Sequence, residues 1–196
     1  MLEAEKKALA QLCQALHSLG QLAGSEGNVS LRAATGEIVL TPSGRHKGSL
    51  TPRDMMVVTP EGALLEGTGK VTKEFPMHQM LYQARPEVGC IVHSHPVYGC
   101  AYAIMGRKIP QDYLLQTKLM VGKIGLAGYA PAGSQALVEE IRPYAGECNL
   151  ILLQNHGVVV CGKNPEDTLC RCETAENIAH SCLLAELMGK TTTISE

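Results

Sequence analysis

The sequence is poor in aromatic and charged residues. Its 196 residues include no tryptophan and one phenylalanine, and 18% of them are charged. With no tryptophan and a single phenylalanine, the core must be built from aliphatic side chains, methionine and cysteine. The formal net charge is −2, and no run of lysine or arginine forms the basic stripe that nucleic-acid binders need. We therefore expect no nucleic acid among the partners of this protein.

Long apolar segments are also missing. No stretch reaches the ~20 apolar residues of a membrane span. Charged residues begin at Glu3, ahead of any apolar run of the kind that a secretory signal needs. We expect a cytoplasmic protein without a membrane partner. Domains usually hold about 50 to 250 residues, so residues 1–196 are expected to form one domain around one core.

The cysteines form no metal-binding or redox motif. Eight are present, but no CxxC occurs and their spacing is irregular. A chain of this length does not need disulfides to fold. We expect mostly buried free thiols.

Helical patterns lie at both ends of the chain. Leucines spaced three and four apart before Gly20 predict an opening helix. A last helix is predicted from the N-cap Asn164 to about Gly189. A third helix is predicted to start at the N-cap Thr72 and stop at Pro86, which places Glu74 in its first turn.

Strand patterns occupy the middle of the chain. Short β-type runs with a hairpin turn at 59–62 precede the Thr72 helix. Apolar, β-branched runs at 87–96 and 148–162 predict two interior strands, with a short helix at 133–144 between them. Helices around a sheet predict α/β layers, and the connections are too short for a regular doubly wound parallel sheet.

Histidines end the apolar part of both interior runs. His93 and His95 are two apart on a strand, so their side chains point to the same face, a spacing that suits two ligands of one metal. His156 ends the other run, followed by Gly157. Three neutral imidazoles with one open position are typical of a catalytic zinc site. We favour a metal site over separately buried, hydrogen-bonded histidines.

Other titratable residues have less specific patterns. Glu74 fits a fourth ligand, a general base, or simply an acid favoured by the helix dipole. His78, four residues later, is interpreted as a structural neighbour because no HExxH is present. Glu173, Glu176 and His180 are predicted to form a solvated helix face.

Three fragments have the composition of a phosphate site. They are "GNVS" at 27–30, "TPSG" at 41–44, and "TK" at 72–73 at the helix start. Exposed glycine amides, hydroxyl donors, a lysine and a helix N-terminus are suited to bind a phosphate monoester. Turns and helix caps use the same residues, so each fragment alone is a weak signal.

Taken in order, five motifs resemble one known family. "GNVS", "TPSG", "TKEF…H", "CIVHSHP" and "QNHGVVV" are similar to motifs of the class II aldolase/adducin-head family, which includes L-fuculose-phosphate aldolase and L-ribulose-5-phosphate 4-epimerase. The resemblance extends from the opening helix to about Gly189. It implies a three-layer α/β/α fold around a mostly antiparallel sheet, and a C4 homotetramer with active sites between subunits.

The resemblance also implies roles for individual residues. The metal ligands are His93, His95 and His156, and the ion is zinc, with manganese or cobalt as alternatives. Glu74 is the acidic residue that moves between metal ligand and base. The implied phosphate cradle consists of Asn28, Ser43, Gly44, Thr72 and Lys73. A tyrosine donated by a neighbouring subunit corresponds to Tyr113, to within about one residue.

Two positions keep other reactions open. The aldolase pattern has Ser-Ser-Glu where this chain has Thr72, Lys73 and Glu74. Lysine there resembles enzymes that decarboxylate phosphorylated 3-oxo-tetronates, in which an added cation would meet a substrate carboxylate. Asp112, beside Tyr113, resembles the acid–base pair of the epimerases.

The leading hypothesis is a metal-dependent lyase. It would cleave a small phosphorylated ketose by retro-aldol reaction to dihydroxyacetone phosphate and an aldehyde. The alternatives are decarboxylation of a phosphorylated 3-oxo-tetronate, 4-epimerisation of a pentulose phosphate, and a non-catalytic binding module like the adducin head. The intact glutamate and histidines argue against the last.

Overall fold

The computed structural model describes residues 1–189 and 191–194. In this part of the chain, eight strands form one sheet in the order β4-β3-β2-β1-β5-β8-β7-β6. Neighbouring strands are antiparallel except for the parallel pair β6 and β7. The strands are β1 Asn28–Arg32, β2 Ile38–Leu40, β3 Met56–Val58, β4 Leu64–Glu66, β5 Cys90–Ser94, β6 Ile124–Ala127, β7 Leu150–Leu153 and β8 Gly157–Gly162. The prediction of a mostly antiparallel sheet is confirmed.

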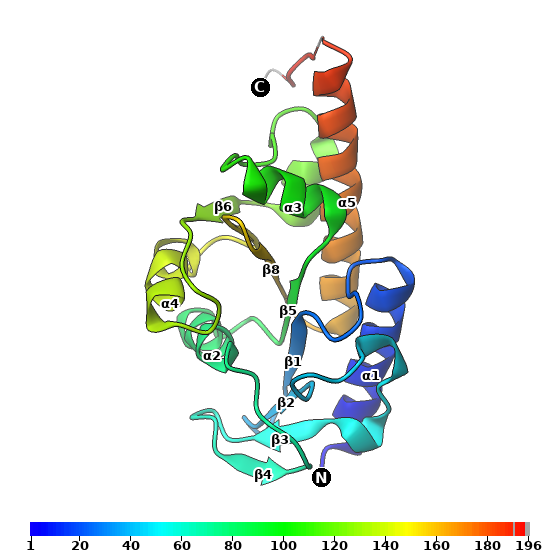
Figure 1. Cartoon of the computed structure of the whole chain (residues 1–196), viewed down its shortest axis with the longest axis vertical. Helices are drawn as coiled ribbons and strands as arrows, with labels where there is room; N and C mark the ends of the chain where they lie inside the picture. Colours follow the sequence, from blue (N-terminus) through cyan, green and yellow to red (C-terminus); the bar gives the residue numbers. More distant parts are fainter. Residues whose placement is uncertain (190, 195–196) are drawn as a thin grey trace.

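Helices cover both faces of this sheet (Figure 1). One face carries α1 (Glu3–Ser18), α3 (Val97–Ile104) and α5 (Pro165–Leu187), and the other carries α2 (Phe75–Ala84) and α4 (Gln135–Ile141). Short 3₁₀ turns lie at Lys47–Ser49, Pro52–Asp54 and Arg142–Tyr144, and a π-helical turn lies at Thr117–Val121. The three-layer α/β/α prediction is therefore confirmed.

The core consists of two apolar clusters, one on each side of the sheet, rather than the one expected. Leu150 and Leu152 of β7 pack towards the side of α1 and α5, whereas Ile151 and Leu153 pack towards α2 and α4. Successive residues of a strand point to opposite faces. A strand with helices on both faces is therefore apolar at every position, which is why these runs lack alternation.

Most predicted helix ends agree with the structure. The α1 helix ends just before Gly20, which has a left-handed φ of 73°. The Ser134 side chain accepts the Leu137 amide at the start of α4, and the Asn164 side chain accepts the Asp167 amide at the start of α5. The β3–β4 hairpin turn at 59–62 is also present, since the Gly62 amide donates to the Thr59 carbonyl.

The predicted N-cap Thr72 is wrong. The α2 helix begins at Phe75, and Glu74 is its N-cap rather than part of its first turn. Pro76 lies in the first turn, where its missing N–H is tolerated. The Thr72 hydroxyl instead accepts the backbone amide of Glu74 at 3.3 Å. This contact ties the chain leading into the helix to the residue that caps it.

The interior run at 148–162 is two strands, not one. β7 and β8 pair as a hairpin through a turn at residues 154–156, and Asn155 has a left-handed φ of 56°. His156 therefore lies in a turn between strands. Both strands are apolar throughout, so only the polar Gln154–Asn155 pair signals the reversal. The structure also adds β6 and α3, which were not predicted.

The thiol prediction is confirmed. All eight cysteines are free, six of them are buried, Cys100 is half-buried and Cys170 is exposed. Burial raises the pKa of Cys90 and of Cys161 to about 12, so these thiols stay protonated and act as small apolar groups.

Within the described ranges, no helix combines the length and the apolar character needed to cross a membrane.

Leu81 tests the packing of α2 on the sheet. Its side chain is fully buried in the cluster on that face. We expect Leu81→Ala to lower the free energy of unfolding by about 2–5 kcal/mol through lost burial and the cavity left behind. Urea denaturation measures the change. The neighbouring Gln83→Ala, at an exposed position, should change it by no more than about 0.5 kcal/mol. Equal losses would contradict this packing.

Candidate metal centre

Three histidines meet at one end of the central strands. His93 and His95 project from the end of β5 towards the face of the sheet that α2 covers, and His156 comes from the β7–β8 turn. The Nε2 atoms of His93 and His95 are 3.2 Å apart. One ligand nitrogen from each histidine lies within 4.8 Å of the other two. The histidines that the sequence singled out are thus brought together.

The outer nitrogens of two histidines are already engaged. His93 Nδ1 donates to the Val158 carbonyl at 3.0 Å, and His95 Nδ1 donates to Glu26 Oε2 at 3.1 Å. In neutral imidazoles these bonds leave a lone pair on each Nε2. Two lone pairs facing each other at 3.2 Å repel unless a cation lies between them. The donor set therefore fits a divalent metal.

Burial favours the neutral, metal-binding form of the ring. His93 is fully buried, and this burial, with the nearby His156 and His95, lowers its pKa to about 3. Burial also lowers the pKa of His156, although Glu74 opposes the shift. Neutral imidazoles can bind a metal without first losing a proton.

The Glu74 carboxylate lies against two of these rings. Its Oε2 is 3.4 Å from His93 Nε2, and its Oε1 is 3.5 Å from His156 Nε2. Asn28 Nδ2 donates to Oε2 at 2.8 Å. Oε1 is buried and has no hydrogen-bond partner among the described residues. An acid serving only the helix dipole would not need to face the histidines, so the geometry favours a ligand or a base.

Two glycines leave room for the histidine-bearing strand. A Cβ on Gly157 would lie 2.3 Å from His95 Cδ2 and 2.6 Å from the Ser94 carbonyl oxygen. A Cβ on Gly27 would lie 2.5 Å from the His93 carbonyl oxygen. Real Cβ atoms do not approach other atoms so closely, so both positions require glycine.

Backbone hydrogen bonds bring the three phosphate-type fragments together. The Thr41 amide donates to the Val29 carbonyl at 3.0 Å, which joins the "TPSG" fragment to the "GNVS" fragment. The Ser43 amide donates to the Lys70 carbonyl at 3.1 Å, which joins the same loop to the chain leading into α2. Of the predicted cradle, Asn28 is buried, Thr72 is half-buried, and Ser43, Gly44 and Lys73 are exposed.

Comparisons with known proteins identify the family of this chain. The sequence profile of the Class II Aldolase and Adducin N-terminal domain family matches residues 7–183. The chain belongs to this family. L-Fuculose phosphate aldolase of Methanococcus maripaludis is 32% identical over 86% of this chain and 91% of its own length. 3-Oxo-tetronate 4-phosphate decarboxylase of Haemophilus influenzae is 32% identical over 90% of this chain and 85% of its own.

A solved structure supports the fold. YgbL of Escherichia coli has a TM-score of 0.92, with 22% identity over 98% of this chain and 94% of that one. The predicted family is confirmed, and so is the prediction of a metal-dependent lyase of the class II aldolase type. Class II aldolases are metal-dependent, and the histidine cluster is a group among the described residues that could hold the ion.

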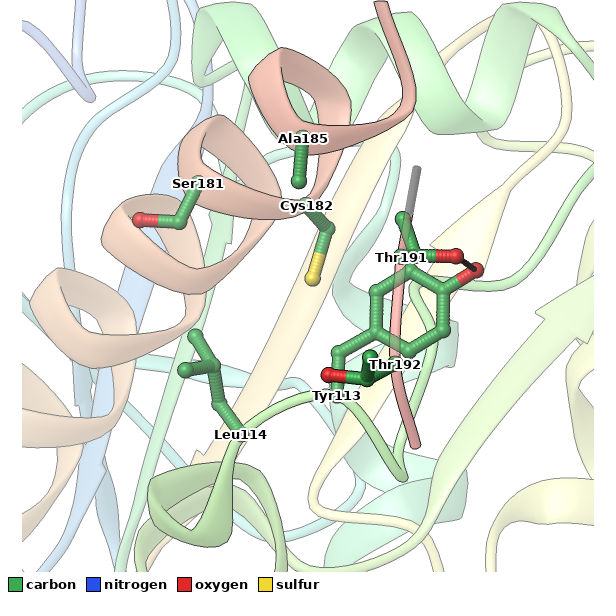
Figure 2. Close-up of a pocket in the computed structure, with 7 residues that line it drawn as sticks. All are labelled: Tyr113, Leu114, Ser181, Cys182, Ala185, Thr191 and Thr192. Atoms are coloured by element: carbon green, nitrogen blue, oxygen red, sulfur yellow. Dashed lines mark hydrogen bonds between the residues drawn. The ribbon is translucent and has the colours of Figure 1, made fainter. Parts of the chain in front are cut away.

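The structure does not bring Tyr113 to the histidines of its own chain. Tyr113 lies in a separate cavity of about 290 Å³ between the loop before the π-helical turn and the end of α5. Figure 2 shows its ring beside the C-terminal segment, with a 3.2 Å hydrogen bond between its hydroxyl and Thr191 Oγ1.

Two polar contacts of this centre were not predicted from the sequence. Glu26, which had no predicted role, hydrogen-bonds to His95. His78, predicted only as a structural neighbour, hydrogen-bonds to Asn28. Two features of the sequence could have indicated these contacts. Glu26 is an acid directly before the "GNVS" fragment, and His78 lies four residues, or one helical turn, after Glu74.

The predicted solvated face of α5 is wrong at Glu176. Its carboxylate accepts the backbone amides of Tyr98 and Gly99, at 2.8 and 2.9 Å, and so caps α3. His180 stacks on Tyr98 with ring centroids 3.8 Å apart. The α3 helix starts directly after the β5 histidines, so its unpaired N-terminal amides attract an acid from the helix packed against it.

Gly157 tests whether close packing holds the metal ligands. We expect Gly157→Ala to push the His95 ring out of place and to weaken zinc binding about 10- to 100-fold, as for lost outer contacts of a metal site. Competition with a chromogenic chelator measures the affinity. Gly146→Ala is the control, because a Cβ there would meet no atom within 4 Å. Unchanged affinity in Gly157→Ala would refute the constraint.

Proposed function

We propose that this class II aldolase family member cleaves a small phosphorylated ketose by retro-aldol reaction to dihydroxyacetone phosphate and an aldehyde. The observation that carries the proposal is the position of Glu74. Its carboxylate faces His93 and His156, and the residue occupies the N-cap position of α2, whose start lies beside the phosphate-type loops. The proposed proton-transfer group therefore lies beside the histidine cluster and near the proposed phosphate contacts, which supports the proposal.

The proposed ligands are His93, His95 and His156, and the proposed ion is zinc, with manganese or cobalt as alternatives. When bound, a divalent ion would supply Lewis-acid polarisation of the substrate carbonyl. Glu74 would handle the proton at the carbon next to that carbonyl. Its Oε2 is held by Asn28, which leaves Oε1 as the oxygen free to exchange a proton.

The remaining predicted residues would orient the substrate. Asn28, Ser43, Gly44, Thr72 and Lys73 are the proposed phosphate contacts. Binding a non-reacting phosphate fixes the reacting carbons and contributes binding energy to the reaction. Tyr113 would exchange a proton with the aldehyde oxygen. Since it lies apart from its own chain's histidines, the proposal needs a homotetramer in which Tyr113 reaches the adjacent subunit.

One observation favours decarboxylation as a second candidate. Lys73 is exposed immediately before Glu74, and its ammonium forms no ion pair among the described residues. A free cation beside the carboxylate suits a substrate that carries its own carboxylate as well as a phosphate. A relative named as a 3-oxo-tetronate 4-phosphate decarboxylase supports this candidate. Asp112 keeps 4-epimerisation as a further alternative.

Proton exchange on dihydroxyacetone phosphate tests the leading proposal. We expect the zinc-loaded protein in D₂O to remove one hydroxymethyl proton signal, because reversible deprotonation gives the enediolate that aldol cleavage requires. ¹H NMR follows the signal, and EDTA should stop its loss. No exchange in protein with stoichiometric metal would contradict the aldolase and favour the decarboxylase or epimerase. A protein that binds no metal would favour the binding module.

Glu74→Gln tests the proton-transfer role. We expect the exchange rate to fall about 10²- to 10⁴-fold, the usual contribution of a general base. Zinc content measured by mass spectrometry should stay stoichiometric, because the three histidines remain. Glu173→Gln, at an exposed position of α5, should leave both quantities unchanged. Retained exchange in Glu74→Gln would remove this residue from the mechanism.

A further inference from the structure

A chain of buried polar side chains continues behind Glu74. Asn28 Oδ1 is 2.5 Å from His78 Nε2, and His78 Nδ1 is 2.7 Å from Ser30 Oγ. Ser30 Oγ is in turn 2.8 Å from the Tyr82 hydroxyl. All four side chains are at most 6% exposed. The metal centre as described above uses only the first of them.

Strand β1 and helix α2, which carry these four side chains, face each other. Asn28 and Ser30 are two apart on β1, so they share one face of the sheet. His78 and Tyr82 are four apart on α2, so they share one side of the helix. The helix packs on that face, and the four side chains interleave between apolar residues.

The chemistry of each group fixes which atom donates and which accepts in this series of hydrogen bonds. A carboxylate only accepts hydrogen bonds, so Asn28 must turn its amide nitrogen to Glu74 and its oxygen to His78. His78 must then carry its proton on Nε2 and accept from Ser30 on Nδ1. Burial, with the nearby His93, lowers the pKa of His78 to about 3, so the ring is neutral and has one N–H.

A reversed arrangement would disturb Glu74. If the His78 proton lay on Nδ1, Nε2 would become an acceptor and Asn28 would turn its nitrogen towards it. The Asn28 oxygen would then face Glu74 Oε2, which in the observed arrangement lies 2.8 Å from the Asn28 amide nitrogen. Two acceptors at that distance repel, and a buried site offers no water to separate them.

We propose that His78 is a positioning residue whose Nε2–H sets the orientation of the Asn28 amide and thereby holds Glu74 Oε2, leaving Oε1 directed at the metal site. The kinetic consequence rests on the proposed function, whereas the tautomer and the placement of Glu74 do not. Asn28 also belongs to the proposed phosphate cradle. The His78 Nε2–H would therefore fix the position of both the Glu74 carboxylate and one contact to the substrate phosphate.

Two substitutions of similar size separate this role from simple packing. In His78→Gln the terminal amide reaches the place of Nε2 and can still donate to Asn28. In His78→Asn the shorter amide reaches only the place of Nδ1 and retains the Ser30 contact. We expect the exchange rate of zinc-loaded His78→Asn to fall about 10- to 100-fold, and that of His78→Gln to stay within about threefold of the original protein.

A packing role predicts a different result. Both variants lose the imidazole ring, so their unfolding free energies and exchange rates would fall together. Equal loss of exchange in the two variants, with both folded and zinc-loaded, would overturn the proposal.

NMR supplies a readout that does not depend on activity. In uniformly ¹³C,¹⁵N-labelled protein, the His78 ring resonances, assigned by through-bond correlation to the His78 backbone, should show a neutral ring protonated on Nε2. The carboxyl ¹³C resonance of Glu74, assigned with Glu74→Gln, should move in His78→Asn and stay in His78→Gln. A ring protonated on Nδ1 overturns the proposal, even where both variants fail to fold. The protein could fail to exchange any substrate proton and still show His78 protonated on Nε2, with the Glu74 carboxyl resonance moving in His78→Asn but not in His78→Gln. That result would refute only the proposed function.

Discussion

The antiparallel pairing of β1 with β5 is the constraint on which the metal centre depends. Its register places Asn28 directly opposite His93. The same register turns Asn28 and Ser30 towards α2, while Val29 between them faces α1 and α5. A slip of one residue would move every one of these side chains to the other face. The ligand strand, the amide that holds Glu74 and the buried histidine behind it are thus fixed by one strand pair.

The centre concentrates lone pairs around the fully buried His93. Two imidazole nitrogens and a carboxylate oxygen converge, and one carboxylate oxygen is left without a hydrogen bond among the described residues. Such an arrangement is costly in an apolar interior unless a cation compensates for it. The Val158 carbonyl and Glu26 select the tautomers of His93 and His95, so both lone pairs are presented before any ion arrives. The arrangement therefore suits a divalent cation, which would offset the repulsion between these lone pairs.

Much of this arrangement could be predicted from the sequence, for identifiable reasons. Spacing of two on a strand is a local property, so the shared face of His93 and His95 followed directly. Helix caps such as Asn164 are local too. The β7–β8 turn was missed because both strands are buried on both faces and give one unbroken apolar run. Glu176 and Glu26 were missed because each acts on an element distant in sequence, and only the tertiary structure brings them together.

The choice of reaction depends on residues around the metal centre rather than within it. A named aldolase and a named decarboxylase are equally similar to this chain, at 32% identity. A metal held by the histidines, with Glu74 as the proposed base, would serve any reaction that builds negative charge beside a carbonyl. Discrimination then requires groups that meet the part of the substrate that differs. In the proposed function these groups would be the exposed Lys73 and, from a neighbouring subunit, Tyr113. A cation and a hydroxyl would act on different substrate ends, so changes at either would redirect the chemistry while the histidine cluster stays the same.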